Sequence, residues 1–232
     1  MTRQQHIVSA FTEELDQLSA DILRMGGIAE AMIKDACRAV VVRDADLAET
    51  VIERDAEMDQ LEREVERKAV RMLALRQPMA SDLRNVIGAI KLAGGIERIG
   101  DLAKSIARRG LAVMHEDNRT ALRGIERMGQ AVSGILQSAL DAYARRDPAA
   151  SVRVLHQDDD IDSHYNGLLR SMLAFMAEAP EQLDTRSNYL FIVKNLERIG
   201  DHSTNIAKVV HFIATGERID PSQSDPTPAA SH

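Results

Sequence analysis

Two identical acidic motifs are the residues of this chain best suited to chemistry. Residues 97–101 have the sequence Glu-Arg-Ile-Gly-Asp, which recurs about 100 residues later at 197–201. Both copies lie in segments with helical apolar periodicity, so each Glu and the Asp four positions on share a helix face. Two carboxylates at that spacing repel each other by about 0.2–0.5 kcal/mol. We therefore expect a cation between Glu97 and Asp101, and another between Glu197 and Asp201.

Each half of the sequence carries a second acidic pair. Asp55 interrupts an apolar stripe of one predicted helix and is followed one turn later by Asp59. Asp158 interrupts a similar stripe in the second half and is followed by Asp162. A carboxylate in such a position costs several kcal/mol unless it is paired or coordinated. Each half thus offers two acid-x-x-x-Asp motifs on two different helices.

Four carboxylates per half, all with oxygen donors, favour hard or borderline divalent cations such as Mg²⁺, Mn²⁺ and Fe²⁺, and would tolerate Zn²⁺. Shared oxygens could bridge more than one ion. The predicted ligands are Asp55, Asp59, Glu97, Asp101, Asp158, Asp162, Glu197 and Asp201. Asp160 and Glu57 are secondary candidates, and His202 could act in the outer sphere. The alternative is a set of solvated faces, neutralised by Arg54, Arg98, Arg109 and Arg198.

Composition favours an all-helical protein, and the absence of catalytic motifs favours a non-enzymatic one. The 232 residues are 44% hydrophobic but only 3% aromatic, with no Trp, which is atypical of β-sandwiches and of base-stacking surfaces. The net charge of −7 argues against a nucleic-acid binder. Neither a Gly-rich phosphate loop nor a catalytic triad is apparent. Cys37 suits a buried core position, and without a secretion signal or a membrane span we expect a cytoplasmic protein.

Apolar periodicity, turn residues and prolines divide the chain into six long helices. Their expected ranges are 8–42, 47–75, 81–115, 118–145, 148–179 and 185–215. Short connections make neighbouring helices antiparallel. The predicted fold is all-α, with two tandem, pseudo-repeated three-helix bundles at 1–116 and 117–216, followed by a disordered Pro/Ser-rich tail at 217–232.

These motifs together resemble the PhoU family of phosphate-uptake regulators. Besides the duplicated Glu-Arg-Ile-Gly-Asp and the two Asp pairs, the resemblance rests on Met-Gly-Gly at 25–27 and Arg-Gln-Pro-Met-Ala-Ser-Asp-Leu-Arg at 76–84. The second half has Ala-Pro-Glu at 179–181 instead of Arg-Gln-Pro, which suggests a different contact there. The resemblance covers nearly the whole chain except the tail.

The resemblance implies a cytoplasmic regulator built from duplicated three-helix bundles. Such a protein links a phosphate ABC transporter, through its ATPase subunit, to a phosphate-sensing histidine kinase, and represses starvation genes when phosphate is plentiful. The resemblance also implies multinuclear metal binding at the eight carboxylates above. We further expect a homodimer that reaches the membrane only through its partners.

Two other functions remain open. A metal-free helical scaffold would need no ligand at the acidic motifs. A carboxylate-bridged di-iron protein would use Glu-x-x-His motifs, yet none of the seven histidines follows a Glu at that spacing.

Overall fold

The chain folds into long helices. The computed structural model describes residues 3–116, 118–178 and 180–219, and the side chains of all of these except 3–9 and 158–160. Within these ranges it contains seven α-helices, a short 3-10 helix and no strand. The elements are α1 (Arg3–Val42), α2 (Ala45–Arg76), α3 (Ala80–Val113), α4 (Arg119–Arg145), α5 (Pro148–Leu155), α6 (Asp158–Glu178), η1 (Pro180–Gln182) and α7 (Leu183–Thr215).

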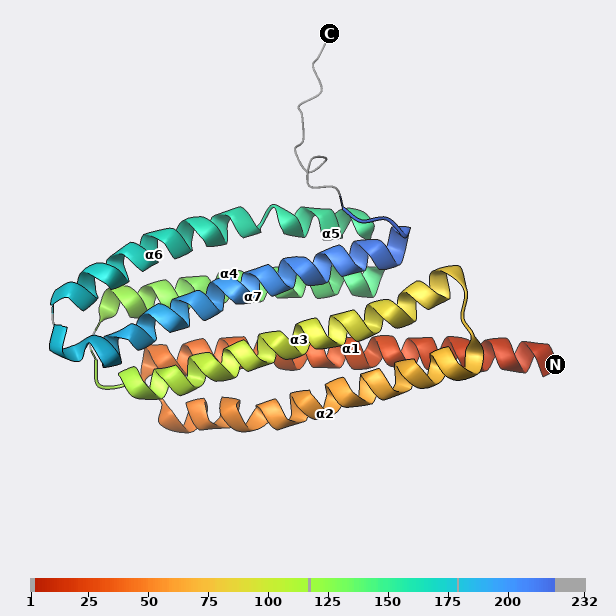
Figure 1. The fold of residues 1–232 in the computed structure, drawn as a ribbon, viewed down its shortest axis with the longest axis horizontal. Coiled ribbons are helices and arrows are strands. Elements are labelled where there is room, and N and C mark those ends of the chain that lie inside the picture. The colour runs from red at the N-terminus through yellow and green to blue at the C-terminus, as the bar shows by residue number, and fades with distance from the viewer. Residues whose placement is uncertain (1–2, 117, 179, 220–232) are drawn as a thin grey trace, which may run out of the picture.

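The helices form two groups that share one long axis. Figure 1 shows α1, α2 and α3 in one group and α4 to α7 in the other, with α3 and α7 side by side between them. Position 88 of α3 faces Ile213 of α7, whereas Ser105 accepts a hydrogen bond from Asn195. Residue numbers therefore rise along α3 as they fall along α7, and the two helices are antiparallel. The all-α prediction with two repeated halves is confirmed.

The same corner connects the first two helices of each half. Arg43 and Arg146 follow α1 and α4 in the left-handed conformation, with φ of 60° and 52°. The next residue in each case is an Asp whose side chain accepts a hydrogen bond from a backbone N–H of the following helix, at Leu47 for Asp44 and at Ala150 for Asp147. In both halves a residue in the left-handed conformation ends one helix and an N-capping Asp starts the next. The two halves therefore share the same capping hydrogen bond at this corner.

The interior is one apolar core to which every α-helix contributes. Small residues let the helices approach closely. A Cβ added at Gly88 would lie 2.4 Å from the Ile213 side chain, and one at Gly110 would lie 2.7 Å from Val40. A Cβ at Gly100, the glycine of the first Glu-Arg-Ile-Gly-Asp motif, would lie 3.2 Å from Met58, so α2 and α3 are closely packed there as well. Cys37 is a free, buried core residue as expected, and burial raises the pKa of its thiol to about 12.

The prediction of one continuous helix at 148–179 is wrong. The structure has two helices there, α5 and α6, separated by His156 and Gln157. The backbone N–H of Gln157 bonds to the carbonyl of Val154, which closes a turn. Three aspartates then begin α6, and acidic residues favour the first turn of a new helix over a helix interior. Most of the predicted disordered tail, residues 220–232, lies outside the described residues. The proposed bundle boundary at 116/117 stays a prediction.

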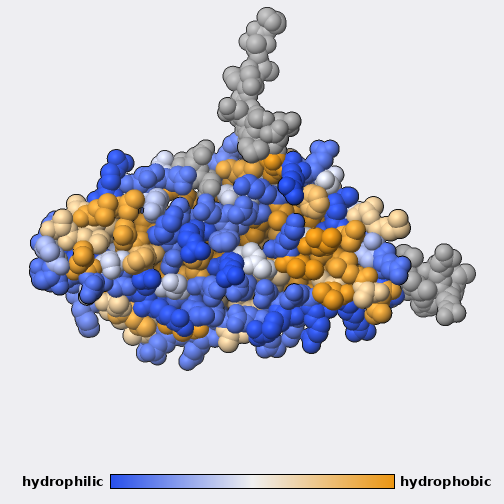
Figure 2. Space-filling view, viewed as in Figure 1, coloured by the Kyte–Doolittle hydropathy of each residue, from blue (hydrophilic) through white to orange (hydrophobic). Residues whose placement is uncertain are grey.

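Polar side chains cover much of the face seen in Figure 2, and hydrophobic ones reach the surface mainly towards its two ends. Near the α2–α3 connection the exposed large hydrophobic residues are Leu75, Met79, Leu83 and Ile87. At the opposite end they are Val42, Leu173, Leu183 and Phe191. None of the described helices is both long enough and apolar enough to cross a bilayer.

Candidate functional site

The acidic residues of the first half meet between α2 and α3. Asp55 lies in the buried stripe of α2 and is only 6% exposed, as its position in the sequence predicts. Its carboxylate accepts a hydrogen bond from the ammonium group of Lys104 on α3, which also lies 3.5 Å from the Asp101 carboxylate. The bond to Asp55 is the main reason that the pKa of Lys104 is raised. A lysine therefore occupies the position between two of the predicted ligands.

Glu97 has an unusual environment on the same side of α3. Burial raises the pKa of its carboxyl group to about 7, and the neighbouring carboxylates of Asp101 and Glu62 add to the rise. Arg98 opposes this effect, with its guanidinium nitrogens 3.7 Å from both Glu97 and Asp101. The predicted convergence of Glu97 and Asp101 is thus present, and Glu62 of α2 joins them.

Asp59 is more peripheral than the other first-half acids. It lies one turn beyond Asp55, and its side chain is 42% exposed. Its carboxylate is 3.9 Å from the guanidinium of Arg63 on the same helix. In solvent a pair of this kind contributes about 0–1 kcal/mol, so it neither fixes Asp59 nor prevents it from turning elsewhere.

The second half has a related but more open arrangement. Lys194 places its ammonium group 2.7 Å from both carboxylate oxygens of Glu197, and this contact is the main cause of its raised pKa. The same ammonium group lies 5.2 Å from the centre of the Tyr165 ring. Asp201 and Asp162 are exposed. The side chain of Asp158 lies outside the described residues.

The carboxylate oxygens of the first-half acids are suitable ligands for a hard divalent cation, but the present spacing of these carboxylates does not suit one. Asp55, Glu97 and Asp101 offer oxygen ligands from two neighbouring helices. Among the side chains that the structure describes, however, no three such groups lie close enough to hold a metal ion as they stand. In each half a lysine supplies the positive charge instead. Metal binding at the eight carboxylates stays a prediction, and it would require Lys104 to move in the first half.

The sequence interpretation missed these lysines and named arginines as the neutralising groups. Arg98 fits that expectation, but Arg54 pairs with Asp35 at 2.9 Å, and Arg109 contacts the Phe191 ring and Asn188. A signal was available, since Lys104 follows Asp101 by three positions and Lys194 precedes Glu197 by three. On a helix this spacing makes the two side chains neighbours.

Comparison with known proteins settles the family. The model of the PhoU domain matches the chain twice, at residues 22–110 and 125–210. The chain belongs to the PhoU family. Each matched stretch contains one Glu-Arg-Ile-Gly-Asp motif and one Asp-x-x-x-Asp pair, so the resemblance drawn from the motifs is confirmed.

PhoU relatives align over nearly the whole chain. A protein of Caulobacter vibrioides (strain NA1000 / CB15N) named "Phosphate-specific transport system accessory protein PhoU homolog" is 45% identical over 93% of this chain and 94% of its own length. A Rhizobium meliloti protein of the same name is 43% identical, over 91% and 90%. The crystal structure of PhoU from Pseudomonas aeruginosa has a TM-score of 0.85 at 36% identity, over 89% of this chain and 100% of its own. PhoU from Streptococcus pneumoniae gives 0.82 at 28% identity, over 90% and 99%.

Proposed function

We propose that this chain is an accessory regulator of a phosphate transport system and acts in the cytoplasm without catalysing a reaction. The observation that carries the proposal is the match of both halves to the PhoU domain, together with relatives named as transport accessory proteins that align over more than nine tenths of the chain. The alternative of a carboxylate-bridged di-iron protein has no such support.

The regulator works as an adaptor. It contacts the ATPase subunit of a phosphate ABC transporter and a phosphate-sensing histidine kinase, and it lowers the output of the kinase when phosphate is plentiful. Long helices that share one core suit this role, because a packed body transmits a contact at one place to another without local unfolding. A homodimer and association with the membrane through these partners complete the proposal.

The acidic cluster between α2 and α3 is the proposed metal site of the first half. Asp55, Glu97 and Asp101 are its ligands, with Glu62 as an added donor. Mn²⁺, Mg²⁺, Fe²⁺ or Zn²⁺ would replace the ammonium group of Lys104. The cation would also offset the burial, and the repulsion from Asp101 and Glu62, that together raise the pKa of Glu97 to about 7. The corresponding ligands of the second half are Asp158, Asp162, Glu197 and Asp201, and Asp59 completes the first set.

Complementation tests the regulatory function. In a Caulobacter vibrioides strain that lacks its own relative, this chain is expected to restore repression of phosphate-starvation genes in phosphate-rich medium. An affinity-tagged copy from the same cells should retain the transporter ATPase subunit or the kinase. A folded, expressed chain that restores no repression and retains neither protein would contradict the proposal.

Metal binding is tested separately on the purified protein. Glu97→Ala/Asp101→Ala should lower the Mn²⁺ that the protein retains after equilibrium dialysis. Glu49→Ala/Glu53→Ala is the matched control, because it removes an exposed acidic pair at the same spacing from α2. Equal metal content in the wild type and both variants would remove the first-half site and leave a metal-free adaptor.

A further inference from the structure

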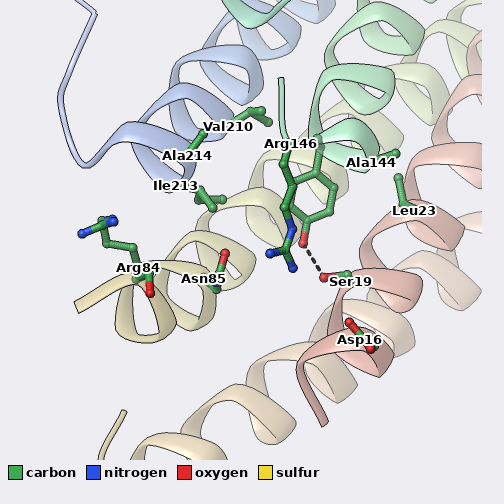
Figure 3. Close-up of a pocket in the computed structure, with 12 residues that line it drawn as sticks. Asp16, Ser19, Leu23, Arg84, Asn85, Ala144, Arg146, Val210, Ile213 and Ala214 are labelled. Carbon is green, nitrogen blue, oxygen red and sulfur yellow. Dashed lines mark hydrogen bonds between the residues drawn. The ribbon is translucent and has the colours of Figure 1, made fainter. Parts of the chain in front are cut away.

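A cavity lies at the end of the molecule where α1, the start of α3 and the ends of α4 and α7 meet (Figure 3). Its volume is about 380 Å³, within the range of small-molecule sites. Leu23, Val210 and Ile213 form an apolar wall. This cavity is distinct from the acidic motifs, none of whose residues lines it.

The polar lining is cationic in a protein that is anionic overall. Arg84 and Arg146 line the cavity together with one carboxylate, Asp16, whereas the whole chain carries a net charge of −7. The nitrogen Nε of Arg84 is buried and has no hydrogen-bond acceptor among the described residues. Its guanidinium carbon would lie 3.3 Å from a Cβ added at Gly216, so this side chain is held against the end of α7.

The side chain of Arg146 makes different contacts from that of Arg43, the corresponding residue of the first half. Both arginines follow a helix in the left-handed conformation, which glycine adopts more easily. Arg43 donates a hydrogen bond to the carbonyl of Glu116 at 2.9 Å and so ties its corner to the α3–α4 connection. Arg146 has no side-chain hydrogen bond or ion pair within the described part of the chain. Figure 3 shows its guanidinium group directed into the cavity.

Neutral hydrogen-bond donors line the same cavity. The hydroxyl of Tyr143 donates to Ser19 Oγ at 3.3 Å, which leaves the Ser19 proton available for another acceptor. Burial raises the pKa of Tyr143, so its hydroxyl keeps its proton at neutral pH. Asn85 lines the opposite side from α3. Donors from three helices thus approach one space from different directions.

We propose that this cavity binds the phosphate oxyanion of a small soluble phosphorylated molecule. Arg146 carries the main ionic contact, and Ser19 and Asn85 supply further donors to the phosphate oxygens. The cavity is much larger than a phosphate group alone, so an organic remainder packs against Leu23 and Ile213 while Asp16 accepts a hydrogen bond from a hydroxyl on it. This site goes beyond the proposed adaptor function and is tested without any transport partner.

Isothermal titration calorimetry on the full-length protein tests the site, with inorganic phosphate, glycerol 3-phosphate and acetate as probes. We expect one saturable site that prefers glycerol 3-phosphate to phosphate and phosphate to acetate. Arg146→Gly should weaken binding by about tenfold or more, because a charge-assisted contact is lost. Arg145→Ala is the control, since Arg145 is the adjacent arginine, does not line the cavity and lies 3.8 Å from Asp141.

Arg146→Gly also separates binding from folding. Glycine suits the left-handed backbone at this position, so the variant should melt at the same temperature as the wild type or higher while its affinity falls. A Ser19→Ala variant with an intermediate affinity would add support. The proposal is overturned if neither soluble phosphate binds saturably at up to about 10 mM, if Arg146→Gly and Arg145→Ala bind equally, or if only phosphatidylglycerol vesicles bind.

Discussion

Replacing Lys104 with Met should destabilise the protein far more than the loss of an ordinary surface lysine. The Lys104 side chain is 22% exposed, and the Asp55 side chain to which it donates is 9% exposed. The variant leaves the Asp55 carboxylate buried without its cation, and breaking a pair of this kind costs about 3–5 kcal/mol. Because Asp101 is also near and water reaches the lysine, we expect the lower end. For a chain of this length about 3 kcal/mol lowers the melting temperature by about 6–12 °C.

Thermal and urea unfolding followed by circular dichroism measures the effect. Lys194→Met is the matched control, because that lysine is 46% exposed and its pair with Glu197 should contribute about 0.5 kcal/mol or less. Asp55→Leu/Lys104→Met should recover most of the stability, since it removes both charges from the buried position. The reasoning is refuted if Lys104→Met costs no more than Lys194→Met. If the metal proposal holds, Mn²⁺ should raise the melting temperature of Lys104→Met more than that of the wild type.

Two further predictions concern the pKa of Glu97 and the close packing of glycines against neighbouring helices. Because the folded protein raises the pKa of Glu97 from 4.5 to about 7, its stabilising contribution is complete below about pH 4.5 and is lost as the pH rises towards 7. Glu97→Gln should therefore gain stability over the wild type between these pH values, and parallel pH curves would contradict this. Gly88→Ala should cost about 1–3 kcal/mol because its Cβ would lie 2.4 Å from Ile213. Gly27→Ala, with no atom within 4 Å, should instead stabilise its helix by about 0.5–1 kcal/mol, and equal urea midpoints for the two alanines would refute close packing at Gly88.

The helices could be predicted because their signals are local. Apolar spacing, the turn residues at 43–46 and Pro78 predict the ends of α2 and α3 within two residues and the end of α1 at Val42. The break between α5 and α6 was missed because the apolar stripe continues through it, and periodicity alone does not reveal a single closed turn.

The partners of the acidic residues were harder to predict. The burial of Asp55 follows from its place in the apolar stripe of α2. The lysine that pairs with it, however, comes from α3, and only the packing of α3 against α2 decides which α3 side chain faces Asp55. The cavity around Arg146 was not predicted at all. Its lining comes from four helices that are far apart in sequence, and only the tertiary contacts bring them together.

The contact between α3 and α7 has approximate two-fold symmetry, like the interface of a homodimer formed within one polypeptide. Gly95 and Asn195 each lie two residues before their motif, and they meet Ile206 and Ser105 of the opposite helix. Identical subunits make contacts of this reciprocal kind across a symmetry axis. The symmetry does not extend to the two ends of the molecule, because Arg43 is hydrogen-bonded to the α3–α4 connection at one end whereas Arg146 lines a cavity at the other.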